Sequence, residues 1–187
     1  MTTVASLHNA VTGALAGLGL HLADDAEARD GHALASDLIS PDIASVECLW
    51  AVQQRTGLSV FAYREADKLT GIFAFLLLNP AGAAALSADA LDAVRPDLAL
   101  LSRRGEAPSA YYGWGFAGST RPARSALVAG ADLLRRQVLP HLPFYCHAAT
   151  PAGRRAVTQK LGYVDIPGSR SGLLYSPPLF QDDRRAA

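Results

Sequence analysis

Two segments in the last third of the chain each run from a strand-like stretch straight into a threonine and a proline that start a helix. The first joins residues 111–118 to the helix that follows Thr120, and the second joins residues 144–149 to the helix that follows Thr150. The first turn of a helix presents unpaired N–H groups and the positive end of its dipole, so a strand leading into it makes an anion site. Parallel strands bring both helix starts to one edge of a sheet, where open α/β sheets bind ligands. The sequence therefore predicts one binding crevice.

The length and the charge balance exclude several classes of protein. The 187 residues are half apolar, and we expect residues 1–187 to form a single domain. Seventeen basic and seventeen acidic residues cancel, which argues against a broad basic face for nucleic acid or for an anionic membrane. The apolar run over 4–20 lacks a basic leader and has helical periodicity, so no targeting or membrane segment is expected.

The cysteines and histidines predict neither a disulfide framework nor a metal site. Cys48 and Cys146 are the only cysteines, and a domain of this size does not need the one disulfide that they could form. We interpret both as buried thiols of a cytoplasmic protein. The five histidines show no metal-ligand spacing, so no metal is expected.

The first part of the chain, residues 1–57, has the pattern of helices. Three are predicted: one over 3–20, one over 24–38 and one that follows Ser40. The third is the best marked, because Ser40 is a good N-cap, Pro41 suits the first helical position and Gly57 suits the end. This part is expected to be a helical cover for the rest.

From residue 58 the periodicity becomes that of strands. Residues 58–63 and 69–78 are predicted to form a hairpin whose second strand is apolar on both faces and therefore central. Residues 81–108 are an insertion in which Ser87 is expected to cap a helix that carries Leu91 and Val94. The remaining elements are a strand over 110–118, a helix over 121–139, a strand over 143–149, a helix over 151–161 and a strand over 172–176. Residues 177–187 form a tail, frayed from Gln181.

This order of elements over residues 58–176 resembles the GNAT superfamily of acyl-CoA-dependent N-acyltransferases. The similar parts are Gly71–Leu76 as the third strand, the loop over 119–126 and the sequence Leu161-Gly162-Tyr163. The resemblance implies an α/β fold with a mixed, mostly antiparallel sheet, two parallel central strands, helices on both faces and the N-terminal helices before them. It also predicts a bulge in the fourth strand, which the glycines within residues 110–118 favour.

The resemblance implies a site for acetyl-CoA. In the family, a loop with the pattern Gln/Arg-x-x-Gly-x-Gly/Ala holds the coenzyme A pyrophosphate through backbone amides, and residues 121–126 occupy this position. Arg124 stands where the pattern has its central glycine, and its side chain either blocks the loop or binds phosphate. A strand amide at Phe116 or Ala117 would polarise the thioester carbonyl. The implied cofactor-binding residues are Phe116, Ala117, Gly118, Arg121, Ala123, Arg124, Ser125 and Ala126.

Catalytic groups are harder to assign. The family often has a tyrosine as general acid where this chain has Thr158, whose hydroxyl is too weak an acid for that role. His147 is the candidate general base, and the alternative interpretation is a hydrogen-bonded core histidine. Cys146 and His147 do not form a catalytic pair, because neighbouring strand residues point to opposite faces.

Three hypotheses are compatible with these observations. The first is a GNAT-like transfer of an acyl group, taken to be acetyl, from coenzyme A to an amine of a small molecule or a protein. The second is a GNAT-fold module that binds a ligand or a protein without transferring anything. The third is an unrelated α/β protein that holds a phosphorylated metabolite at its helix starts. A homodimer is compatible with each of them.

Overall fold

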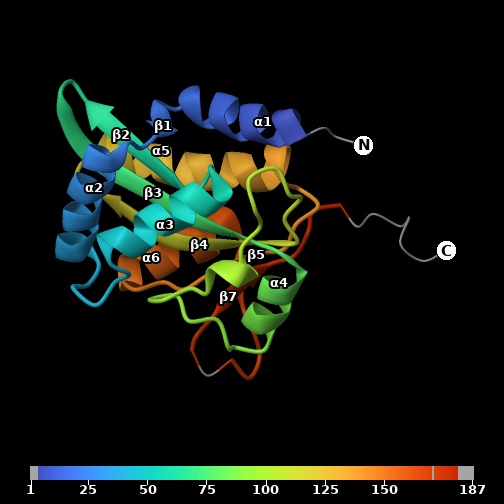
Figure 1. The fold of residues 1–187 in the computed structure, drawn as a ribbon. Coiled ribbons are helices and arrows are strands. Elements are labelled where there is room, and N and C mark those ends of the chain that lie inside the picture. The colour runs from blue at the N-terminus through green and yellow to red at the C-terminus, as the bar shows by residue number, and fades with distance from the viewer. Residues whose placement is uncertain (1–3, 170, 181–187) are drawn as a thin grey trace.

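A computed structural model describes residues 4–169 and 171–180 of the chain, and their centre is one twisted sheet (Figure 1). Within these residues the strands are β1 Leu20–Leu22, β2 Val60–Glu65, β3 Lys68–Leu78, β4 Ala110–Gly118, β5 Phe144–Cys146, β6 Val164–Asp165 and β7 Leu174–Ser176. Their order across the sheet is β1-β2-β3-β4-β5-β7-β6, and β4 with β5 is the one parallel pair among them. The predicted class, α/β with a mixed and mostly antiparallel sheet, is confirmed.

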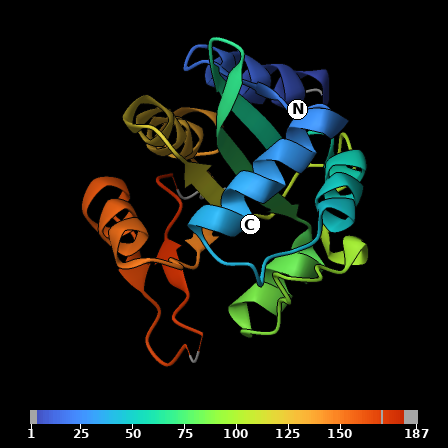
Figure 2. The same cartoon turned by 90° about the vertical axis from the view of Figure 1, so that its left-hand side faces the viewer.

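Helices cover both faces of the sheet (Figures 1 and 2). They are α1 Val4–Ala16, α2 Asp25–Leu38, α3 Val46–Thr56, α4 Pro80–Ser87, α5 Arg121–Leu133 and α6 Pro151–Arg155. Wider turns extend α5 through η2 Leu134–Val138 and α6 through η3 Ala156–Lys160, and a short 3₁₀ turn, η1, spans Leu98–Leu100. The helices α1, α5 and α6 pack on one face, and α2, α3 and α4 pack on the other.

The strand β3 holds the two layers together. From Thr70 to Leu78 it is buried, and its alternate side chains enter different cores. Phe73 and Phe75 pack with α1 and α5, whereas Ile72 and Ala74 pack with α2 and α3. Complete burial of a side chain of phenylalanine size stabilises the fold by about 1.5–3 kcal/mol, so both layers depend on this strand. The prediction of a central strand is confirmed.

The two threonine caps predicted at the helix starts are present. Thr120 Oγ1 accepts a hydrogen bond from the Ala123 N–H at 3.2 Å, and Thr150 Oγ1 accepts one from the Gly153 N–H at 3.0 Å. Each cap satisfies one of the unpaired amides of its first turn. Both helices therefore begin beside the carboxyl ends of the parallel strands β4 and β5, as expected.

The N-terminal part is not wholly helical, and its third helix begins later than predicted. Leu20–Leu22 form an edge strand on β2, because Gly19 turns the chain with a φ of +78° and Leu20 is then buried. The third helix begins at Val46 with Ser45 as its cap, not at Ser40. Ser40 and Ser45 both precede this helix, and Ser45 is the one that caps it. Residues 39–45 form the loop between α2 and α3.

The insertion was also predicted wrongly. Its helix ends at Ser87 instead of beginning there, because the Asn79 side chain accepts from the Gly82 N–H at 2.9 Å and Pro80 takes the first helical position. The strand predicted over 143–149 ends at Cys146, and β6 has no counterpart in the sequence prediction. Residues 177–180 contain no helix or strand, and the rest of the predicted tail, 181–187, lies outside the described residues.

Candidate functional site

The strand β4 bends at a bulge halfway along its length. Its register on β3 pairs Gly113 with Phe75 and Gly115 with Ala74, which leaves Trp114 as the extra residue. Such a bulge turns the strand and redirects its backbone groups. The bulge predicted from the glycines is confirmed, and it lies at the point where β4 begins to leave its other neighbour.

The parallel strands β4 and β5 separate after one short paired stretch. They pair from Tyr111 with Phe144 to Gly113 with Cys146, and β4 then continues to Gly118 without this partner. The Ser119 N–H donates to the Thr70 carbonyl at 2.9 Å, so by alternation the Ala117 amide faces β3. The amides of Phe116 and Gly118 face the opposite, open side. An extended ligand could pair with β4 there as an added strand.

The start of α5 closes one end of this opening. A Cβ atom on Gly118 would lie 3.0 Å from the Arg124 backbone nitrogen, so glycine is needed for the helix to begin so close to the strand. Thr120 occupies the Ala123 amide and Pro122 has none, which leaves the amides of Thr120 and Arg121 to meet a ligand. Ala123 and Ala126 are buried, whereas Arg121, Arg124 and Ser125 are exposed.

Two charged side chains lie at this helix start. Arg124 Nη1 donates to the carbonyl oxygens of Gly118 at 3.3 Å and Ser119 at 3.2 Å, so the guanidinium folds over the end of β4. The Thr120 hydroxyl donates to Glu65 Oε2 at 2.5 Å. A carboxylate therefore lies at the positive end of α5 beside an arginine, a relationship that the sequence prediction missed.

His147 is part of a chain of four polar side chains. Its Nδ1 lies 2.8 Å from the Tyr112 hydroxyl, and its Nε2 lies 2.8 Å from Ser171 Oγ. The Ser171 hydroxyl donates to Asp89 Oδ1 at 2.5 Å, so Ser171 accepts from the Nε2–H of a neutral His147 and Tyr112 donates to Nδ1. Burial lowers the pKa of His147, and the Asp89 carboxylate opposes this shift by raising it. The histidine is hydrogen-bonded at both nitrogens, yet one side of it is exposed.

The other two candidates near this opening have no freedom for proton transfer. The Thr158 hydroxyl donates to the Arg154 carbonyl of its own helix at 2.8 Å. Cys146 is buried, and burial raises the pKa of its thiol to about 12. Cys146 faces the α5 layer, whereas His147 meets Tyr112 of the other layer, so the two do not form a pair. Cys48 is only half-buried, which corrects the expectation of two buried thiols.

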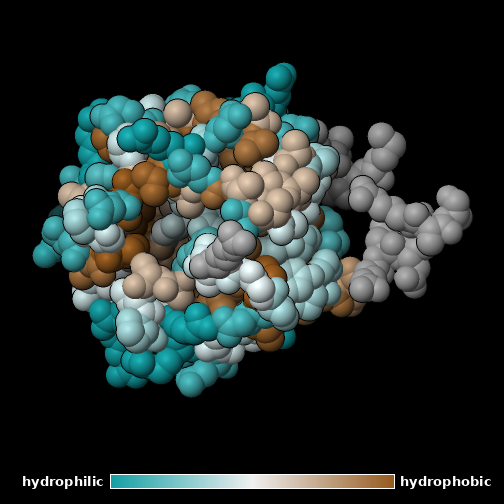
Figure 3. Space-filling model, turned by 90° about the horizontal axis from the view of Figure 1, so that it is seen from below, coloured by the Kyte–Doolittle hydropathy of each residue, from teal (hydrophilic) through white to brown (hydrophobic). Residues whose placement is uncertain are grey.

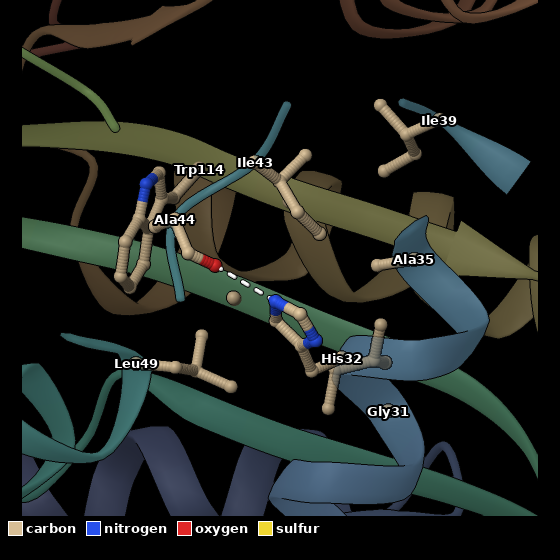
Figure 4. A pocket seen from close by; sticks show the side chains of 11 residues that line it. Gly31, His32, Ala35, Ile39, Ile43, Ala44, Leu49 and Trp114 are labelled. Atoms are coloured by element: carbon tan, nitrogen blue, oxygen red, sulfur yellow. Dashed lines mark hydrogen bonds between the residues drawn. The ribbon is translucent and has the colours of Figure 1, made fainter. Parts of the chain in front are cut away.

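An apolar pocket lies on the opposite face from α5 and adjoins the bulge (Figure 4). It is lined by Gly31, His32, Ala35, Ile39, Ile43, Ala44, Leu49, Ile72, Ala74, Trp114 and Gly115. None of the α2 residues among them was predicted from the sequence. The available signal was the small pair Gly31 and Ala35, one turn apart on the face that packs on β3. Seen from below, the side that carries α2 and α6 is hollowed and lined with hydrophobic residues (Figure 3).

Two further structural findings bear on the classes considered. No helix in the described part of the chain combines the length and the apolar character that crossing a bilayer requires. Within residues 4–169 and 171–180, no three His, Cys, Asp or Glu side chains are grouped to hold a metal ion.

Comparisons with known proteins add little to this geometry. No known protein family matches the chain, and no curated protein does. One similar solved structure is described as a crystal structure of histone acetyltransferase HPA2 and related acetyltransferase from Corynebacterium glutamicum. It is 16% identical, the match covers 87% of this chain and 97% of that one, and the TM-score is 0.45.

Proposed function

We propose that this protein is a GNAT-like N-acyltransferase that moves an acetyl group from coenzyme A to an amine. The observation that supports this proposal best is the separation of β4 from β5 after Gly113 and Cys146, directly before the capped start of α5. The gap suits the extended pantetheine arm, and the helix start with Arg124 suits the pyrophosphate. The proposal includes a reducing, cytoplasmic location, which suits the two free cysteines.

Coenzyme A would supply an activated thioester, and the residues of this chain would bind and orient it. The Gly118 N–H and the Phe116 carbonyl would pair with the amides of the pantetheine arm. The Phe116 N–H would also donate to the thioester oxygen, where negative charge develops as the amine attacks the carbonyl carbon. Phe116 takes this role in preference to Ala117, whose amide faces β3.

His147 would accept the proton that the attacking amine loses as the new C–N bond forms and the C–S bond breaks. Its ring stays neutral near pH 7, because burial lowers its pKa, and a neutral imidazole is the form that can act as a base. To do so, the ring must change its tautomer, so that Nδ1–H donates to the Tyr112 hydroxyl, and the unprotonated Nε2 must exchange its contact with Ser171 for one with the substrate or a water. Thr158 is too weak an acid to protonate the departing thiolate, so water would supply that proton.

The direct test is calorimetric titration with acetyl-CoA and with free coenzyme A. Micromolar to low millimolar binding of both is expected, and absence of binding at millimolar concentration would refute the proposed function. Release of free thiol in the presence of an amine, measured with a thiol reagent, then tests the transfer itself.

A second candidate is a GNAT-fold module that binds its ligand without transfer. The observation that favours it is that neither Thr158 nor His147 is free to act as an acid or a base. Thr158 is hydrogen-bonded within its helix, and both nitrogens of His147 are engaged. Binding of coenzyme A without thiol release for any amine tested would support this candidate over the enzyme.

A further inference from the structure

The apolar pocket and the start of α5 lie on opposite faces of the sheet. The lining of the pocket comes from α2, the loop over 39–45, α3 and the bulge of β4. Trp114 and Gly115 of the bulge line it, and the next residue is Phe116, whose amide faces the gap beside β4. A ligand held at the α5 start and a second molecule in the pocket would therefore meet at this part of β4 from opposite sides.

The pocket offers almost no polar partners. Its side chains are aliphatic apart from the Trp114 indole and the His32 imidazole (Figure 4). His32 Nε2 donates to the Ala44 carbonyl at 2.9 Å, and the Trp114 indole N–H donates to the Ala93 carbonyl at 2.7 Å, so both donors already have partners within the protein. Among the described residues, no Asp, Glu, Lys or Arg lines the pocket. A charged group placed there would lose its hydration without compensation, so the lining favours an uncharged, apolar group.

The size of the pocket limits that group. Its volume is about 70 Å³, roughly half of the ~150 Å³ of a dry protein cavity that takes up benzene. A branched or straight aliphatic group of a few carbons fits this space, whereas a phenyl ring does not. The small residues Gly31 and Ala35 shape this space. Gly31 lets α2 lie close to β3, because a Cβ atom there would lie 2.5 Å from Ile72 Cδ1, and Ala35 lines the pocket with only a methyl group.

We propose that the acceptor of this protein is a small aliphatic amine whose apolar group binds between α2, α3 and the β4 bulge. The inference rests on the proposed acyl transfer. The amine nitrogen lies at the mouth of the pocket beside Phe116, and the hydrocarbon lies inside it. Polyamines are excluded, because their second ammonium group would have to enter an uncharged space.

The first experiment compares acceptors at saturating acetyl-CoA by thiol release. The expected kcat/KM for isopentylamine is at least about tenfold above that for methylamine, because each buried methylene contributes about 0.8 kcal/mol. The kcat/KM values for putrescine and phenethylamine are expected to be at least tenfold below that for isopentylamine. Putrescine carries a second charge, and the ring of phenethylamine is too large for the pocket. A preference for putrescine, or equal rates for methylamine and isopentylamine, would overturn the proposal.

The second experiment detects binding without coenzyme A, so that it does not depend on the proposed chemistry. In a Trp50→Phe background, the fluorescence of Trp114 reports on the pocket directly. Isopentylamine is expected to shift this emission saturably, and putrescine is not. If isopentylamine leaves the emission unchanged while acetyl-CoA binds by calorimetry, the pocket proposal fails and the proposed function stands. If the shift occurs but acetyl-CoA does not bind, the proposed function fails and the pocket is still an apolar-amine site.

The third experiment uses a variant in which a larger side chain fills the pocket. Ala35→Leu puts an isobutyl group into the space and is expected to abolish both the fluorescence shift and the preference for isopentylamine over methylamine. Ala33→Leu, on the exposed side of the same helix, is the matched control and should change neither. If Ala35→Leu instead changes only the preference between acetyl-CoA and butyryl-CoA, the occupant is the acyl chain and the proposal is wrong.

Discussion

Thr120 and Glu65 share a hydrogen bond of 2.5 Å across the start of α5, in which the hydroxyl donates and the carboxylate accepts. The same oxygen of Thr120 caps the helix by accepting from the Ala123 amide. The cap is thus oriented by a negative charge that lies where the positive end of the helix would attract a phosphate. Glu65 thus stabilises the start of the helix, and its charge would oppose an anionic ligand there.

Glu65→Gln should therefore bind coenzyme A more tightly. The gain is expected to be about two- to fivefold, because a carboxylate near the surface repels a charge several ångströms away by roughly 0.4–1 kcal/mol. The effect should shrink at high salt, where such charges are screened. Calorimetric titration at low and high salt measures both. Glu106→Gln, in the loop that meets Arg55 at the far end of α3, is the control for net charge. Equal affinities of Glu65→Gln and the parent protein would contradict this explanation.

The Arg124→Ala variant tests whether the Arg124 side chain binds phosphate or blocks the loop, the two roles that the sequence leaves open. One nitrogen of the guanidinium is hydrogen-bonded to the end of β4, so Nε and Nη2 remain to meet a phosphate beside the Arg121 amide. Loss of one charged hydrogen bond costs about 1.5–3 kcal/mol, so coenzyme A should bind at least about tenfold more weakly. Arg124→Lys should recover only part of the lost affinity, because lysine keeps the positive charge but lacks the paired N–H donors of the guanidinium. Arg136→Ala, near the other end of α5, is the control. Unchanged or tighter binding in Arg124→Ala would identify an obstruction.

The protonation of His147 should depend on Asp89. Burial lowers the pKa of His147 from its ordinary 6.5, and the Asp89 carboxylate raises it. Asp89→Asn should therefore lower the pKa of His147 further, and the matched charge control Asp37→Asn should leave this pKa unchanged. Because the folded-state pKa is depressed, His147 contributes stability above pH 6.5 that is lost as the pH falls through the folded pKa. NMR titration of the ring protons gives the midpoint in each variant. A midpoint above 6.5 in the parent protein would contradict the arrangement.

Local rules account for the parts of the site that the sequence predicted. A threonine one or two residues before a proline is a strong local signal for a helix start, so Thr120 and Thr150 could be assigned as caps from the sequence. The glycines around Trp114 predicted the bulge for a similar reason. The strand β3 was predicted to be central because a strand buried on both faces must be apolar throughout.

The rest of the site depends on contacts between distant segments. Ser171 reaches His147 across 24 residues and Asp89 across 82, and none of the three lies in a motif. The choice of Ser45 over Ser40 as a cap depends on the loop whose Ala44 carbonyl accepts from His32. Leu20–Leu22 become a strand only because β2 offers them an edge. Propensity is a weak guide wherever tertiary packing makes such choices.

Gly31 should be intolerant of even a methyl group, whereas Gly13 should not. A Cβ atom on Gly31 would lie 2.5 Å from Ile72 Cδ1 and 2.9 Å from its Cγ1, so α2 could no longer lie this close to β3. Gly31→Ala is expected to lower the free energy of unfolding by about 1–3 kcal/mol, as overpacking does. A Cβ atom on Gly13 meets nothing within 4 Å, so Gly13→Ala should raise it by about 0.5–1 kcal/mol through helix propensity. Urea denaturation measures both changes.

The contact between Gly31 and Ile72 can be tested by a double-mutant cycle. Ile72→Val removes the Cδ1 atom and should restore part of the stability that Gly31→Ala loses, and the cycle isolates this coupling. If Gly31→Ala is as stabilising as Gly13→Ala, α2 does not pack on β3 through this contact, and the pocket beside it cannot have the shape described.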